Sequence, residues 1–96
     1  MAEFILFMHG DGPSSDPAAW GPYLTRLRAS GAFEGGSEIG DGACYRKSQA
    51  PAPVSAQIGG YIKVQAADLS EARRWLEGNP VYEAGGTIEI RELPTS

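Results

Sequence analysis

A single histidine stands where the first apolar segment of the chain ends. The segment FILFM is followed by His9 and then by Gly10-Asp11-Gly12. An imidazole titrates near neutral pH, so a histidine at the end of a strand can act as a general acid or base. It can also have a structural role in closing a turn, which is the more common role of one unpaired histidine. We therefore take His9 as the candidate catalytic residue and keep the structural role as the alternative.

The residues around His9 match no better-known catalytic or binding motif. α/β-Hydrolases place a His-Gly-rich turn after a strand, but they also need a Gly-x-Ser-x-Gly elbow and a separate histidine, and neither occurs here. The glycines lack the spacing and the lysine of a phosphate loop. His9, Asp11 and Asp16 have no recognisable metal-ligand spacing. Cys44 has no second histidine to serve as its base. We therefore expect no metal and no cofactor.

Composition restricts the class of protein further. The 96 residues, 42% of them apolar, predict one domain spanning residues 1–96. Eight basic against twelve acidic residues give a net charge of −4, which disfavours nucleic-acid binding. The single cysteine cannot form an internal disulfide, as is typical of a reducing compartment. The apolar run is too short for a signal peptide or a membrane span. We expect a cytoplasmic protein without a membrane partner.

The first half of the chain predicts a strand, a helix and a weaker strand. Glu3 to Met8 is a largely buried strand. A helix begins with Asp16 as its N-cap and Pro17 at its first position, and it extends to about Ala29. Because Gly21-Pro22 lies inside this segment, we expect a short first turn followed by a regular helix. Phe33 to Ile39 is a strand that its paired glycines should bulge.

The second half repeats the pattern after an irregular segment. Residues 40–57 contain no clear element, although Cys44-Tyr45-Arg46 could pair as a short strand. Ile58 to Val64 alternates as a strand should. The sequence DLSE, from Asp68 onward, predicts a capping box before a second helix that ends near Gly78. That helix should bury a stripe made of Leu69, Ala72, Trp75 and Leu76. Thr87 to Leu93 is the last strand.

The order β-α-β-β-α-β predicts an α+β, ferredoxin-like fold with an antiparallel sheet and both helices on one face. The other sheet face would be open in a monomer. The first strand has no polar side, so this face must present either Ile5 and Phe7 or the alternate set Phe4, Leu6 and Met8. Soluble monomers seldom expose such a patch, which predicts a homodimer. We expect the polar residues of the face to pair within the interface; they are Tyr61, Lys63, Glu89 and Arg91.

The chain resembles the YCII-related family, and more closely its DGPF-domain branch. The resemblance rests on FILFMHGD, WGPYLTRLRASGAFEGGSEI, IGGYIKVQAADLSEARRWLEGNP and EAGGTIEIREL, in that order. It covers nearly the whole chain, although the DGPF motif itself is replaced by APAPVSAQ. The resemblance implies a ferredoxin-like subunit that dimerises into an α+β barrel.

The resemblance also implies a possible catalytic pair. Enzymatic members such as ring dehydrochlorinases are thought to use a His-Asp dyad, with the histidine on the first helix and the aspartate before the proline after the second. The matching positions here are Tyr23 and Asn79. A tyrosine is far from ionised near pH 7, and an amide is not a base, so neither can do the same acid–base work.

Three functions therefore remain open. The first is a small homodimer with a pocket for a small organic ligand. The second is a YCII-like enzyme, of lyase, dehydrochlorinase or hydrolase type, that uses His9 as its acid–base group on a cyclic or carbonyl substrate. The third is a non-catalytic interaction module. If a pocket exists, we expect the side chains of five residues to approach it: His9, Trp20, Tyr23, Tyr61 and Asn79.

Overall fold

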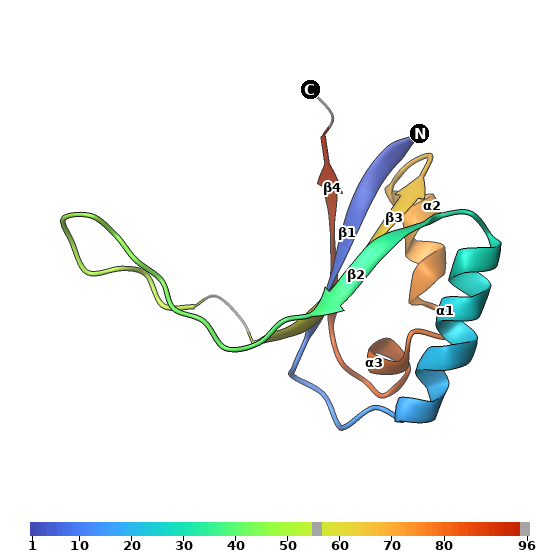
Figure 1. Cartoon of the computed structure of the whole chain (residues 1–96), viewed down its shortest axis with the longest axis horizontal. Helices are drawn as coiled ribbons and strands as arrows, with labels where there is room; N and C mark the ends of the chain where they lie inside the picture. Colours follow the sequence, from blue (N-terminus) through green and yellow to red (C-terminus); the bar gives the residue numbers. More distant parts are fainter. Residues whose placement is uncertain (55–56, 95–96) are drawn as a thin grey trace.

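Four antiparallel strands form one sheet in the order β2-β3-β1-β4 (Figure 1). They are β1 (Ala2–His9), β2 (Phe33–Glu38), β3 (Ile58–Ala66) and β4 (Ile88–Leu93). The computed structural model describes residues 1–54 and 57–94. Each strand agrees with the expected one to within two residues at either end. The predicted ferredoxin-like α+β fold is confirmed.

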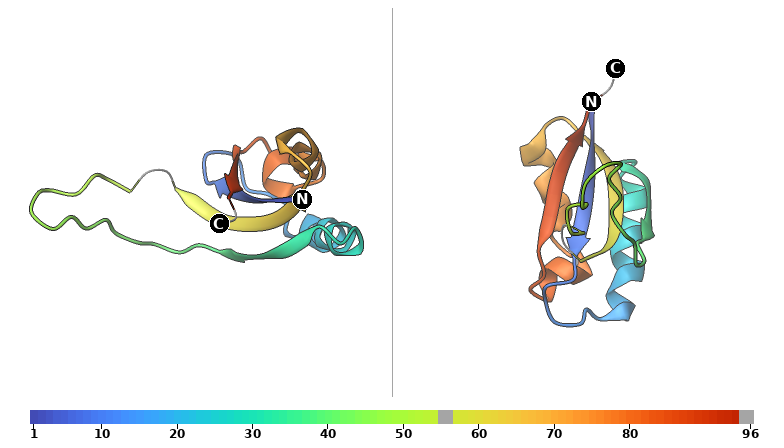
Figure 2. Two further views of the ribbon diagram at one scale, coloured as in Figure 1. Left: turned by 90° about the horizontal axis from the view of Figure 1, so that it is seen from above. Right: turned by 90° about the vertical axis from the view of Figure 1, so that its left-hand side faces the viewer.

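The helical segments all lie on one face of this sheet (Figure 2). The first connection holds a 3-10 turn, η1 (Pro17–Ala19), and helix α1 (Trp20–Ala29). The second connection holds α2 (Leu69–Ala72), the 3-10 turn η2 (Arg73–Leu76) and α3 (Pro80–Glu83). Within residues 1–54 and 57–94, no helix has the length and apolar character that crossing a bilayer requires.

Alternate residues of β1 form the centre of the core. Phe4, Leu6 and Met8 are buried under the helices, where they meet Leu27 of α1 and Val64 of β3. Because strand side chains alternate between faces, Ile5 and Phe7 point to the open face. The structure thus decides between the two sets that the apolar first strand left open.

The first helix begins as the sequence predicts. The Asp16 side chain accepts a hydrogen bond from the Ala18 backbone N–H at 3.0 Å, and Pro17 opens the 3-10 turn. Pro22 is the third residue of α1, a position whose backbone N–H would have no partner inside the helix. The proline therefore costs no helical hydrogen bond there. Gly31, with φ of 81°, follows the end of the helix.

The second helical segment differs from the single helix that we expected. Asp68 caps α2 as predicted, since its carboxylate accepts from the Glu71 N–H at 2.9 Å. The α-helix ends at Ala72, however, and continues only as a 3-10 turn. Leu69 is 50% exposed, so its place in the buried stripe was predicted wrongly. A turn with three residues per rotation aligns side chains differently from an α-helix, which displaces the stripe.

The N-cap of α2 can be tested directly. Replacing Asp68 by Ala should lower the free energy of unfolding by about 1 kcal/mol, because helix-end N–H groups lose their acceptor. The measurement is the urea unfolding midpoint, with Asp41→Ala as the control because that acid lies in an exposed segment without helix or strand. An equal midpoint for Asp68→Ala and the wild type would show that the cap contributes nothing.

β2 contains a bulge, and the segment that follows it is extended and exposed. The predicted bulge in β2 is present, as the register with β3 shifts between Phe33 and Gly35, whose φ is 118°. The short strand that Cys44-Tyr45-Arg46 could have formed is not present. Instead, residues 39–54, hereafter the arm, contain no helix or strand, and every one of them is exposed. The arm extends away from the sheet on the side opposite the helices (Figure 1).

Candidate ligand site

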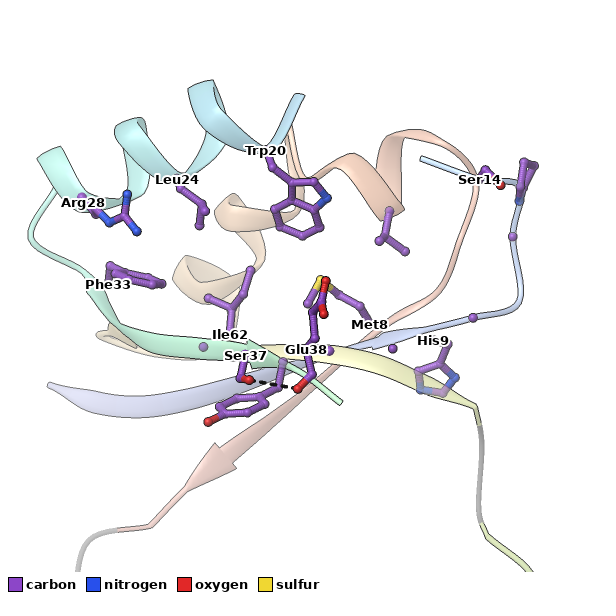
Figure 3. Close-up of a pocket in the computed structure, with 18 residues that line it drawn as sticks. Met8, His9, Ser14, Trp20, Leu24, Arg28, Phe33, Ser37, Glu38 and Ile62 are labelled. Atoms are coloured by element: carbon purple, nitrogen blue, oxygen red, sulfur yellow. Dashed lines mark hydrogen bonds between the residues drawn. The ribbon is translucent and has the colours of Figure 1, made fainter. Parts of the chain in front are cut away.

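A cavity of about 580 Å³ lies between α1 and the sheet (Figure 3). Trp20 and Leu24 project into it from α1, while Met8, Phe33 and Ile62 contribute from three strands. Its volume falls within the range of pockets that hold small molecules, and its walls are mostly apolar, as in such pockets. The geometry therefore fits a small organic molecule with a flat apolar body.

Charged and titratable side chains lie at different places along this cavity. Arg28 is at one end, with its Cζ atom 5.4 Å from the centre of the Phe33 ring (Figure 3). Within residues 1–54 and 57–94, no carboxylate forms an ion pair with Arg28. Glu38 lies near the middle, below Trp20, and the His9 ring lies farther along, on the side of the strands away from α1 (Figure 3). The guanidinium is thus positioned to meet a negative group on a molecule that stacks against the aromatic walls.

His9 is paired with a carboxylate from the neighbouring strand. Its Nε2 atom lies 2.9 Å from Oε1 of Glu89 on β4, and Oε2 of Glu89 lies 3.3 Å from Nη1 of Arg91. These contacts favour the ionised carboxylate, so they lower the pKa of Glu89, with the hydrogen bond from His9 as the larger cause and that from Arg91 next. With Nε2 held in this way, Nδ1 is the ring nitrogen left for a bound molecule.

The pairing of His9 with Glu89 has a measurable consequence. The pKa of Glu89 should lie below its ordinary value of 4.5, and replacing His9 by Ala should raise it because the main hydrogen bond is lost. Replacing Arg91 by Ala should raise it less. The measurement is the pH titration of the Glu89 side-chain carbon by NMR, with Asp41 of the exposed segment after β2 as the internal reference. A larger rise in Arg91→Ala than in His9→Ala would refute the proposed order of the two contacts.

Gly12, the second glycine after His9, allows a close packing contact. A Cβ atom on Gly12 would lie 2.6 Å from the backbone nitrogen of Gly86, which no side chain tolerates. Asp11 accepts hydrogen bonds from the Thr87 backbone N–H at 2.9 Å and from the Thr87 hydroxyl at 2.6 Å. These two bonds, the hydroxyl one first, lower the pKa of Asp11. The Gly-Asp-Gly sequence therefore fixes the loop after β1 against the start of β4.

Tyr23 and Asn79 are buried in the core and are absent from the cavity wall, which includes His9, Trp20 and Tyr61. The Tyr23 hydroxyl donates to the Trp75 carbonyl at 2.6 Å. Burial raises the pKa of Tyr23, and the nearby Asn79 amide offsets part of that rise. The Asn79 side-chain oxygen caps α3, and its nitrogen lies 3.8 Å from the Met8 sulfur. Tyr23 thus joins α1 to η2, and Asn79 joins the start of α3 to β1.

Sequence reasoning missed Glu89 as the partner of His9. The signal was only partial. The alternation of the last strand placed Glu89 opposite its aliphatic side chains, but the facing of the first strand, and with it that of His9, was left open. Phe7 stands opposite Glu89 in the register, and the irregularity between Met8 and His9 sets the imidazole beside that carboxylate. Within the residues that the structure describes, no three His, Cys, Asp or Glu side chains gather as metal ligands would.

Comparisons with known proteins agree with the fold. The YCII-related domain matches residues 15–94, so the chain belongs to the YCII-related family. A solved structure, the 5-chloro-2-hydroxyhydroquinone dehydrochlorinase TftG from Burkholderia phenoliruptrix in complex with 2,5-dihydroxybenzoquinone, is similar with a TM-score of 0.59. The two sequences are 17% identical, and the match covers 98% of this chain and 95% of the other, which establishes a shared fold. No curated protein matches the sequence significantly.

Proposed function

We propose that this YCII-family protein is a homodimer that binds a small planar anion in the cavity between α1 and the sheet. The observation that carries the proposal is the cavity itself, about 580 Å³ in volume, with the Trp20 and Phe33 rings on its walls and Arg28 at one end. Aromatic walls favour a flat ligand, and a guanidinium favours a carboxylate or an ionised phenol.

The Glu38 carboxylate limits where the ligand carries its charge. It lies near the middle of the cavity, below Trp20 and away from Arg28 (Figure 3). A second negative group would be repelled there, whereas a hydroxyl could donate a hydrogen bond. The favoured class is therefore an aromatic or quinonoid molecule with one anionic end and one hydroxyl end.

The ligand class is tested by a matched pair of probes. We expect 4-hydroxybenzoate to bind at least tenfold more tightly than its neutral analogue 4-hydroxybenzamide, as measured by calorimetry. Arg28→Met should remove this preference, while Arg74→Met, on the exposed surface of η2, should keep it. Equal affinities for the two probes would contradict the charge assignment, and absence of binding for both would contradict the cavity.

The homodimer is supported by the open sheet face. Ile5 and Phe7 lie there, only partly buried within the chain, with Tyr61 opposite Phe7 on β3. The charged residues of the face are already paired, Lys63 with Glu3 at 3.4 Å and Glu89 with His9 and Arg91. Burying paired charges in an interface requires less free energy than burying isolated ones. A second copy of this face is therefore a suitable partner.

A second candidate function, proton transfer, is favoured by the His9–Glu89 hydrogen bond. A carboxylate on one ring nitrogen orients the imidazole, as in His-carboxylate pairs of enzymes generally. Nδ1 of His9 would then take a proton from a bound hydroxyl or acidic C–H group and return it to a leaving group.

The TftG relative offers a first probe for this chemistry, since its structure contains 2,5-dihydroxybenzoquinone and its name states dehydrochlorination of 5-chloro-2-hydroxyhydroquinone. Turnover of that chlorinated substrate would be followed as chloride release. We expect any turnover to be lost in His9→Gln, to fall in Glu89→Gln and to persist in Arg74→Met. Undiminished turnover in His9→Gln would remove His9 from the chemistry.

A further inference from the structure

The arm, residues 39–54, is a long exposed segment without helix or strand in the part of the chain that the structure describes. We propose that the arm of each protomer lies along the body of the second copy and clasps the dimer. The inference rests on the homodimer of the proposed function and adds to it a specific contact, an exchange of arms in addition to the stacking of the two open faces.

The exposure of the arm is the first support. All of its residues are exposed, including Tyr45 at 91% and Val54 at 54%. The radius of gyration of the chain is 14.7 Å, whereas a compact domain of this length has about 12.5 Å. The longest dimension of the molecule is 47 Å and its shortest 19 Å. A segment that carries tyrosine and valine without covering them has surface available for another molecule.

The direction of the arm is the second support. It leaves the end of β2 and projects outward on the side of the open sheet face, away from the helices (Figures 1 and 2). A second sheet stacked on that face would lie about 10 Å away. Half of the arm spans up to about 27 Å when extended. Each arm is therefore long enough to pass the partner's sheet and reach the side of its helices.

The chemistry of the arm matches the body of the same chain. The arm holds two of the eight Lys and Arg residues, Arg46 and Lys47, but one of the twelve Asp and Glu residues. It is thus a basic segment on an acidic chain, and the body of a second copy offers it complementary charge. Tyr45, next to this basic pair, is a residue type that often anchors interfaces.

The backbone of the arm also suits binding in an extended form. Pro51 and Pro53 restrict the free chain, so less conformational entropy is lost when the segment is held against a partner. Two basic residues are few for an anionic membrane or a nucleic acid, which recruit clusters of them. In a dimer with two-fold symmetry, by contrast, each arm can contact the body of the other copy, so both arms bind at once.

The only cysteine of the sequence lies in the arm and provides the test. Cys44 of the full chain would be labelled with a benzophenone maleimide and irradiated in a mixture of ¹⁵N-labelled and unlabelled protein. We expect crosslinks between chains, identified by mixed isotope pairs. The matched control is Cys44→Ser with Arg74→Cys, which carries the same probe on η2 and should give few crosslinks between chains.

A second measurement separates this inference from the dimer on which it rests. Replacing residues 41–54 by a Gly-Ser-Gly linker should raise the dimer dissociation constant at least tenfold in sedimentation, with an unchanged circular dichroism spectrum, and Tyr45→Ser should raise it by a smaller factor. A wild-type dimer that shows no crosslinks between chains and is unaffected by the linker would overturn the arm exchange alone. A monomeric wild type would overturn both proposals.

Discussion

Replacing Phe7 by Asp should convert the dimer into a monomer, with a rise of the dissociation constant of at least 100-fold. The side chain points to the open face, opposite Tyr61 on one side and Glu89 on the other. An aspartate at this position would bring a second carboxylate beside Glu89 and would have to be buried without a partner. The fold itself should persist, because the buried residues of β1 are on the other face.

The measurement is light scattering and sedimentation of the purified protein across micromolar concentrations. Leu69→Asp is the matched control, since Leu69 is a half-exposed leucine on α2, on the helix side of the sheet. It should leave the dimer intact. A monomeric wild type would defeat the dimer proposal, and a dimer that tolerates Phe7→Asp would place the interface elsewhere.

Replacing Trp20 by Ala should weaken binding of the planar anion by at least 30-fold. The indole is part of the cavity wall, and its removal takes away the largest flat surface that a ligand could stack against (Figure 3). A 30-fold loss corresponds to about 2 kcal/mol, the magnitude expected for removing one well-packed aromatic contact.

The loss of binding in Trp20→Ala must be separated from a loss of folding. Calorimetry with 4-hydroxybenzoate would measure affinity, and thermal unfolding would show whether the fold remains. Trp75→Phe is the control, because Trp75 lies outside the cavity wall and its contact with Tyr23 is made through the backbone carbonyl. Equal affinity in Trp20→Ala and the wild type would show that the ligand does not use this cavity.

Local sequence patterns predicted the strands and the ends of the first helix well. The β1 segment is apolar on both sides, however, so its sequence could not decide which face meets the helices. That choice depends on packing against α1 and β3, and it places Phe4, Leu6 and Met8 inside. Patterns with a period of two are reliable when one face is polar and ambiguous when neither is.

The second connection shows how a local motif can be misread. We expected the second helix to end near Gly78, just before the pair Asn79-Pro80. The same pair is also a good start, since an asparagine can cap N–H groups and a proline suits the first helical position. The Asn79 side chain accepts from the Val81 and Tyr82 N–H groups at 3.0 and 3.2 Å, which begins α3.

The candidate site was predictable in part. Its strand-end histidine and Trp20 follow from residue type and position, and both lie on the cavity wall. The burial of Tyr23 and Asn79 could not be predicted from their positions in the family's sequence pattern. Spacing along the chain does not determine how far a side chain lies from solvent. The pairing of His9 with Glu89 joins residues at opposite ends of the sequence, so it required the strand order of the folded sheet.

The central claim is that the cavity between α1 and the sheet binds a planar anion, and the two tryptophans of the sequence allow a direct measurement. Uniformly ¹⁵N-labelled protein would be titrated with 4-hydroxybenzoate while both indole N–H signals are followed in ¹H–¹⁵N spectra. We expect the Trp20 signal to shift in a saturable way together with the backbone signals of Gly36 and Gly60, which line the same cavity, while the Trp75 signal stays in place. An unchanged Trp20 signal at saturating ligand, or a shift confined to Trp75, would contradict the claim.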